Sequence, residues 1–181
     1  MEKWETVVNT EKLKNEIRDA FADVEKPPHW ALSGSNEGDE PVALTEEFAS
    51  VPDWDSLDAA FLDGTPKGLS SALSFFSDEA FRYYLPAYMI ADIDCLLETA
   101  DPVFHLCYGL GDDGDELVNP RRYGNRTVRD EANYRLSMFS RRHATAIVEY
   151  LRNRHDNDDF DAPKIRTALD AFWIARSQGV K

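Results

Sequence analysis

A nearly continuous apolar stretch with a proline in its middle constrains this fold more than any other feature of the sequence. It spans residues 77–97. Ser77, followed by Asp78 and Glu79, is a favourable helix start, because a hydroxyl and two carboxylates meet the unpaired amides of the first turn. Pro86 has no amide hydrogen, so the helix must kink there or restart with Pro86 in its first turn. Because apolar residues occur on nearly all sides, we expect a buried central helix.

Periodic apolar residues predict three further helices, over residues 10–24, 141–153 and 164–177. In each of them apolar side chains recur three or four positions apart, which places them on one face of a helix. Residues 103–108 form either a short strand or an extended connection. The pattern therefore predicts a mainly α fold, a single compact helical domain around the Pro-kinked central helix, with at most one small β element.

Three segments between the predicted helices are expected to be mobile loops of one domain that spans residues 1–181. They lie near residues 33–41, 109–120 and 154–162, where turn-forming and acidic residues replace periodic apolar ones. A length of 181 residues suits one compact domain. An apolar fraction of 43%, with 12% aromatic residues, is too high for a disordered chain.

No part of the sequence is typical of export or of membrane insertion. The first five residues contain no basic start that leads into an apolar segment, and no apolar run approaches the roughly 18 residues that cross a bilayer. Cys95 and Cys107 are too few for a disulfide framework and too far apart for a metal or redox pair. We therefore expect a cytoplasmic chain with two reduced thiols.

The formal net charge of −14 is spread unevenly along the chain. Residues 1–60 hold 5 basic and 15 acidic side chains, residues 61–120 hold 2 and 11, and residues 121–181 hold 13 and 8. The basic third either lies over the acidic two thirds of its own fold or presents a surface for phosphate or an acidic partner. The overall charge repels nucleic acid and anionic membranes, so we expect neither as a partner.

The motifs that usually carry chemistry are incomplete here. Gly109, Gly111 and Gly114 have the spacing of a dinucleotide-binding loop, but Asn119-Pro120 prevents the helix that this loop needs. Neither acidic loop has the residue order of an EF-hand, and the four histidines lack metal-binding spacing. We therefore expect no catalytic motif, no metal site and no cofactor.

Two groups of residues remain as candidate sites. The first is a set of acidic residues in the second predicted loop, which we expect to contact a basic partner. It consists of Asp112, Asp113, Asp115 and Glu116. The second is a polar set inside the apolar stretch, in which Tyr84, Tyr88 and Asp92 are four positions apart and so can share one helix face. It consists of Arg82, Tyr84, Tyr88 and Asp92. If that face is concave, hydroxyls and a desolvated carboxylate form a ligand pocket; otherwise the set belongs to the core and its rim.

The apolar stretch also carries a family resemblance. Residues 72–91 read Ala-Leu-Ser-Phe-Phe-Ser-Asp-Glu-Ala-Phe-Arg-Tyr-Tyr-Leu-Pro-Ala-Tyr-Met-Ile-Ala and follow Trp54-Asp-Ser-Leu57. This block resembles a family of small bacterial proteins known as a domain of unknown function, and the helix predicted near residues 141–153 is similar too. The resemblance implies a bacterial, cytoplasmic protein. It brings no activity and no catalytic residue with it.

These observations favour a non-enzymatic, acidic protein-binding module that neutralises a basic partner, as immunity proteins do. The reasons are the acidic excess before residue 121 and the incomplete catalytic motifs. The alternative is a small-molecule-binding protein or an enzyme. It would use the Tyr84, Tyr88 and Asp92 face or the arginine-rich last third. A closed pocket with a perturbed acid or converging arginines would favour this alternative.

Overall fold

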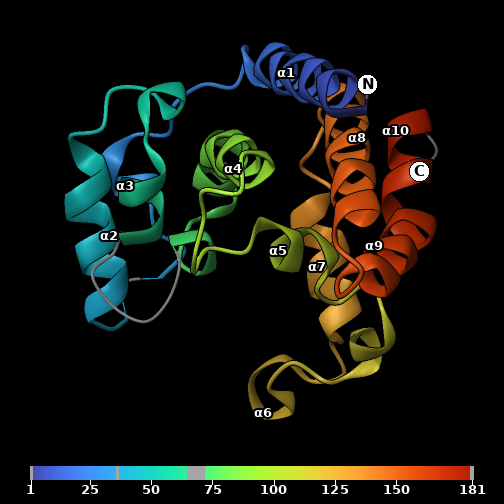
Figure 1. Ribbon diagram of the computed structural model, residues 1–181. Helices are drawn as coiled ribbons and strands as arrows, with labels where there is room; N and C mark the ends of the chain where they lie inside the picture. The colour runs from blue at the N-terminus through green and yellow to red at the C-terminus, as the bar shows by residue number, and fades with distance from the viewer. Residues whose placement is uncertain (1, 36, 65–71, 180–181) are drawn as a thin grey trace. The chain divides into compact units, whose positions relative to one another are not determined.

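The protein is mainly helical, as the sequence predicts (Figure 1). The computed structural model describes residues 2–35, 37–64 and 72–179. Within these ranges the only β pairing consists of two isolated bridges, one between Ser33 and Phe76 and one between Leu117 and Thr127. The chain divides into two compact units, residues 1–102 and 103–181, called unit 1 and unit 2 below. One domain over residues 1–181 stays a prediction.

The described residues of unit 1 form four α-helices and three short 3₁₀ turns. The helices are α1 (Glu2–Phe21), α2 (Asp39–Ala49), α3 (Ala59–Gly64) and α4 (Asp78–Ile93), and the turns are η1 (His29–Ala31), η2 (Trp54–Ser56) and η3 (Ala72–Ser74). The helix predicted over residues 10–24 is the second half of α1. It ends at Phe21, before Pro27 and Pro28.

The predicted central helix is α4. Its N-cap is Ser77, whose hydroxyl accepts a hydrogen bond from the amide of Ala80 at 3.1 Å. Pro86 lies inside one continuous helix that runs to Ile93, so the chain does not restart there. Most α4 side chains are buried, and they surround the helix as the sequence pattern requires. Burial on all sides supplies the packing energy that offsets the hydrogen bond lost at Pro86.

An aromatic cluster forms the core of unit 1. It consists of Phe48 from α2, Phe61 from α3, Phe76, and Tyr84 from α4. The Phe48 ring meets the other three edge-on, with centroid distances of 5.1 Å to Phe61, 5.0 Å to Phe76 and 4.8 Å to Tyr84. Such edge-on contacts add to the energy of burial itself. The aromatic cluster therefore ties α2 and α3 to the central helix.

Helix α1 packs against α4 and is fixed by a buried lysine. Only 7% of Lys14 is exposed, and its Nζ donates to both carboxylate oxygens of Asp94 at 2.9 and 3.0 Å. Nζ also pairs with Glu11 on the same helix. Burial alone would lower the pKa of Lys14, but the hydrogen bonds and charges of the two carboxylates raise it. The ammonium is therefore held in its charged form, as a buried charge requires.

Asp63, at the end of α3, holds the chain segment that follows α4. Its carboxylate accepts hydrogen bonds from the backbone amides of Glu98, Thr99 and Ala100 at 2.7, 3.1 and 2.8 Å. Burial alone would raise the pKa of Asp63, but these hydrogen bonds outweigh it and lower the pKa below its ordinary value. The charged carboxylate thus serves as the hydrogen-bond acceptor for three successive backbone amides.

Asp63→Ala is expected to lower the free energy of unfolding by about 2 kcal/mol at pH 7. Because the folded-state pKa of Asp63 is lowered, its contribution is complete above the unfolded-state pKa and disappears as pH falls through the folded-state value. Urea unfolding of wild type and variant at pH 7 and at about pH 2.5 should show the difference shrinking on acidification. An equal difference at both pH values would contradict the role assigned to the carboxylate.

Unit 2 is built from the remaining helices, which are shown in yellow to red in Figure 1. They are α5 (Pro102–Cys107), α6 (Pro120–Tyr123), α7 (Val128–Leu136), α8 (Arg141–Asn157), α9 (Ala162–Ala168) and α10 (Ile174–Gln178), with a 3₁₀ turn η4 (Asp112–Asp115) and a π-helical turn η5 (Leu169–Trp173). The predicted helix over residues 141–153 is α8, and the one over residues 164–177 is α9, η5 and α10 in unbroken succession.

The core of unit 2 lies where α8 packs against α9, η5 and α10, which run beside it in Figure 1. Helix α8 begins with a reciprocal cap, because the Ser140 hydroxyl accepts from the amide of His143 and the His143 ring accepts from the amide of Ser140. Trp173, in η5, is fully buried and its indole nitrogen donates to the carbonyl of Leu106 at 2.8 Å. This hydrogen bond joins the last helix to α5.

The prediction for residues 103–108 is wrong, because the chain is helical there up to Cys107. Pro102 suits the first position of a helix, since its missing amide hydrogen is not needed there. Val103, Leu106 and Cys107 are buried, three positions and then one apart, which is helical spacing. The short apolar run fits a strand equally well in isolation, and its contacts in unit 2 decide between the two.

The three predicted loops are shorter than expected. Helix α2 begins at Asp39, η4 occupies Asp112–Asp115, α8 continues to Asn157 and α9 begins at Ala162. Asp39 and Glu40 favour the first turn of α2, whereas Arg154 and His155 favour the last turn of α8. Asn36 lies outside the described residues, and mobility of the three loops stays a prediction. Among the helices described, none has the length and apolar character needed to traverse a lipid bilayer.

Candidate functional site

The net negative charge of the protein resides in unit 1. Residues 1–102 contain 22 acidic and 7 basic side chains, whereas residues 103–181 contain 12 acidic and 13 basic ones. The densest part is residues 37–58, called the acidic segment, which holds eight carboxylates and no lysine or arginine. Lys26, the cation that precedes it, donates to the backbone carbonyls of Val51 and Pro52. The acidic segment is therefore a local source of negative potential.

Most carboxylates of the acidic segment are exposed. The exposed members are Glu37, Asp39, Glu40, Glu46, Asp53, Asp55 and Asp58. Two of them also have structural roles, because Asp53 accepts a hydrogen bond from Tyr83 at 3.2 Å and Asp58 accepts one from the amide of Phe61 at 2.8 Å. Large apolar side chains are exposed nearby in the sequence, since Trp30 in η1 is 76% exposed and Val42 in α2 is 50% exposed.

The four acidic residues predicted to bind a partner lie together in and just after η4. Asp113 is used internally, because its carboxylate accepts a hydrogen bond from the amide of Gly109 at 2.9 Å. Asp115 lies 3.5 Å from the guanidinium of Arg129 and keeps a side chain that is 90% exposed. Asp112 and Glu116 are exposed as well. Three of the four carboxylates therefore remain accessible, and their role in binding stays a prediction.

Arg129 fixes the shape of this acidic turn. Its guanidinium donates to the carbonyls of Leu110 and Gly111 at 3.1 and 2.9 Å. A β-carbon at Gly114 would come within 2.6 Å of both that guanidinium and the carbonyl of Gly109. Gly114 is therefore required by the close packing of the acidic turn, and the expected lack of a cofactor stays a prediction. Arg129, fifteen positions beyond Gly114 in the sequence, supplies the hydrogen bonds that fix the turn.

Several arginines of the basic third form ion pairs within unit 2. Arg126 pairs with Glu131 at 2.9 Å, Arg152 with Glu149 at 2.8 Å, and Arg154 with Asp158 at 3.4 Å. Exposed pairs of this kind contribute little to stability. They do mean that part of the arginine charge is balanced by carboxylates of the same unit.

The predicted polar set on α4 is distributed between core and surface. Tyr84 and Tyr88 are fully buried, whereas Arg82 and Asp92 are half-buried. The Tyr88 hydroxyl donates to the carbonyl of Leu62 at 3.4 Å, and burial raises the pKa of both tyrosines well above the ordinary value. The two rings pack in the core, and a ligand-binding role for the set stays a prediction.

Tyr84→Phe is expected to leave the free energy of unfolding unchanged or to raise it by about 1 kcal/mol. The Tyr84 hydroxyl oxygen is buried without a hydrogen-bond partner, so its removal eliminates a desolvation cost while the ring keeps its contacts. Urea unfolding measures the change, and Tyr88→Phe, which loses a hydrogen bond, is the matched control. A loss of more than about 1 kcal/mol in Tyr84→Phe would show that the hydroxyl has an essential partner.

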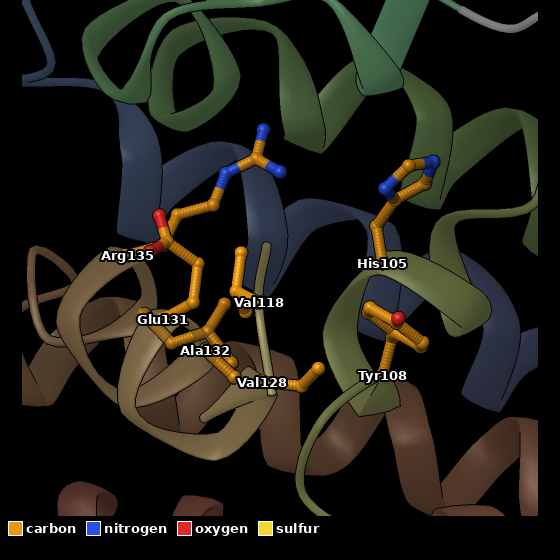
Figure 2. Close-up of a pocket in the computed structure, with 8 residues that line it drawn as sticks. His105, Tyr108, Val118, Val128, Glu131, Ala132 and Arg135 are labelled. Carbon is orange, nitrogen blue, oxygen red and sulfur yellow. The ribbon is translucent and has the colours of Figure 1, made fainter. Parts of the chain in front are cut away.

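A cavity of about 250 Å³ lies within unit 2, between α5 and α7 (Figure 2). Its apolar wall comes from Val118, Val128, Ala132 and Leu136. Polar groups from both helices complete it. They are His105 and Tyr108 from the α5 side and Glu131 and Arg135 from α7. Figure 2 shows the side chains of His105 and Arg135 extending from opposite sides toward the same end of the cavity.

His105 is held in its neutral form. Burial lowers the pKa of its imidazole to about 4, and the nearby charge of Arg135 acts in the same direction. A neutral ring presents one hydrogen-bond donor and one acceptor. The imidazole therefore accompanies the Arg135 guanidinium as an uncharged polar group.

The lowered pKa of His105 makes the protein sensitive to mild acid. Because the folded-state pKa of His105 is about 4 and the ordinary value is 6.5, its contribution to the free energy of unfolding is complete above pH 6.5 and is lost as pH falls toward 4. His105→Asn is expected to remove about 1 kcal/mol of this dependence, a value discounted because the ring is part-exposed. Unfolding curves at pH 7 and 4.5 measure it. Parallel pH profiles for variant and wild type would contradict it.

Sequence reasoning did not find this cavity. Its residues come from three separate segments, and their spacing does not resemble a known binding motif. The available signal was limited to Arg135, one of the arginines in the basic third. Cys95 is exposed and Cys107 is buried, and the two do not form a disulfide bond. In the described ranges, no three His, Cys, Asp or Glu side chains gather as a metal ion would require.

Comparison with known protein families gives a match that covers most of the chain. The model of a family of unknown function, DUF6714, matches residues 9–177. No curated protein and no solved structure matches the chain. The matched range includes α4, the acidic segment and every residue that lines the cavity.

Proposed function

Since the chain belongs to DUF6714, a family of unknown function, we propose a role from its own charge and geometry: it is a non-enzymatic protein-binding module that neutralises a basic partner. The observation that carries the proposal is the negative charge of unit 1, which has 22 acidic and only 7 basic side chains. A field of this sign speeds association with cationic proteins and slows association with anionic ones. The proposed site of action is the cytoplasm. The protein would neutralise its basic partner by binding it, as an immunity protein neutralises a toxin.

Two acidic regions, one in each unit, are proposed as separate contacts for the partner. The acidic segment, residues 37–58, supplies exposed carboxylates that draw the partner in. Asp112, Asp115 and Glu116 in the turn held by Arg129 supply direct contacts, because a preformed turn costs little entropy when it binds. The exposed Trp30 is a candidate anchor in unit 1, since tryptophan is enriched among residues that dominate binding energy.

Affinity capture from a lysate of the source organism, at low and at high salt, tests the proposal. We expect one predominant basic protein that is retained at low salt and lost as salt rises. Its association with the wild type would then be compared with a triple reversal in the acidic segment, Glu40→Lys, Glu46→Lys and Asp55→Lys. Because steering acts on encounter, the triple variant should lower the association rate about tenfold or more.

Two further triple variants complete the design. Asp112→Lys, Asp115→Lys and Glu116→Lys should raise the dissociation rate, because these residues are proposed contacts. Asp156→Lys, Asp159→Lys and Asp170→Lys change the net charge equally on exposed residues of unit 2 and should have the smallest effect. Absence of any basic protein at low salt would overturn the proposal, and equal effects of all three variants would overturn the proposed contacts.

The second candidate function is small-molecule binding. The specific observation that favours it is the cavity between α5 and α7, which lies in the unit that contains the basic third. It differs from the Tyr84, Tyr88 and Asp92 face, because its polar groups converge on an open volume. The two candidate functions are compatible, since the cavity and the acidic segment belong to different units.

A further inference from the structure

We propose that the cavity of unit 2 binds a small carboxylate with a compact apolar body, such as a short branched or aromatic acid. This proposal rests on the second candidate function, small-molecule binding at the same cavity, and names its ligand class from the residues of unit 2 alone. A volume of about 250 Å³ is below the roughly 300–1,000 Å³ of sites for drug-sized ligands. The occupant is therefore small.

The wall of the cavity selects an apolar body. Val118, Val128 and Ala132 place aliphatic carbons on one side, and the Tyr108 ring lies opposite (Figure 2). Leu136 also lines the cavity. The Tyr108 ring is itself stacked on Phe104 at a centroid distance of 5.0 Å, which fixes its orientation. A flat or branched hydrocarbon group between these walls would lose most of its contact with water.

The opposite end of the cavity selects a negative charge. The Arg135 guanidinium and the His105 imidazole extend toward this end from the two helices. A guanidinium binds a carboxylate through two parallel N–H groups, and a neutral imidazole adds one more donor. The lowered pKa of His105 agrees with a positive potential there, because the Arg135 charge contributes to it.

The carboxylate of Glu131 also lines the cavity, and its own pairing decides whether an anion is tolerated. Its Oε2 lies 2.9 Å from the guanidinium of Arg126, outside the set of lining residues. Arg126 in turn lies 5.6 Å above the ring of Tyr134. The Glu131 charge is thus paired with Arg126, while the Arg135 guanidinium lines the cavity.

Titration of isotope-labelled protein with matched probes tests this proposal. The probes are benzoate, benzamide and benzamidine, which share a ring and differ in charge. We expect benzoate to shift the backbone amide signals of Val118, Val128 and Ala132, and to bind at least tenfold more tightly than benzamide or benzamidine. Equal binding of benzoate and benzamide would overturn the anion preference, and absence of benzoate binding would overturn the site.

Three variants separate the parts of the proposal. Arg135→Gln should weaken benzoate binding tenfold or more while leaving benzamide binding unchanged, because only the charged contact is lost. Val118→Phe should abolish binding of both by filling the cavity at a half-exposed position. Arg152→Gln, on the exposed side of α8, is the matched control and should bind like wild type. Unchanged benzoate binding in Val118→Phe would place the probe elsewhere and overturn the proposal.

Discussion

Trp173→Ala is expected to lower the free energy of unfolding of unit 2 by about 3–5 kcal/mol. Trp173 is among the largest fully buried side chains of the protein. Its ring packs against Phe139 and Phe172 at centroid distances of 5.8 and 5.0 Å, so alanine would leave a cavity that rigid helices cannot close. Removal of the indole also leaves the buried carbonyl of Leu106 without its donor.

Denaturant unfolding followed by far-ultraviolet circular dichroism measures this change. Trp173→Phe keeps most of the ring volume and should cost less, mainly through the lost hydrogen bond to Leu106. Tyr134→Ala removes an aromatic side chain of unit 2 that is 66% exposed and should change stability by less than about 1 kcal/mol. If Trp173→Ala behaves like Tyr134→Ala, the assignment of the unit 2 core is wrong.

Phe48→Ala is expected to have an effect of similar size on unit 1, about 3–5 kcal/mol. Phe48 is fully buried and is the one member of the aromatic cluster that meets Phe61, Phe76 and Tyr84 edge-on. Its loss would remove contacts to α3 and α4 together, so the neighbouring rings cannot fill the space without leaving their own contacts.

The matched control for Phe48→Ala is Trp30→Ala, which removes a larger aromatic side chain that is 76% exposed in the same unit. We expect Trp30→Ala to leave the unfolding midpoint nearly unchanged, because little apolar surface is returned to water. Circular dichroism during urea unfolding measures both variants. A large loss in Trp30→Ala with a small one in Phe48→Ala would invert the proposed core and surface of unit 1.

Sequence reasoning identified only part of the acidic surface, namely the turn Asp112–Glu116, and did not single out the acidic segment. The acidic turn Asp112–Glu116 is conspicuous because its carboxylates are consecutive, yet Asp113 is committed to the amide of Gly109. The carboxylates of the acidic segment are spread over 22 residues and attract less notice. Division of the chain into units makes the difference apparent, because the charge of unit 2 is nearly balanced.

The sequence by itself determined the longest helices, α1, α4 and α8, and their buried faces. The Ser77 start, the apolar residues around α4 and the periodic stripes of α1 and α8 follow from interactions between residues a few positions apart. Such local preferences need no knowledge of the rest of the chain. The mainly α fold class was predictable for this reason.

Only the tertiary structure decided the helical state of residues 103–107, the burial of Tyr84 and Tyr88, and the cavity between α5 and α7. Each of these depends on residues distant in sequence: Trp173 binds the carbonyl of Leu106, Phe48 packs on Tyr84, and Arg135 faces the cavity with His105. A short apolar run or a polar stripe has the same local pattern whether it meets protein or water. The free energy of packing against distant partners decides between these environments, and a local pattern does not contain it.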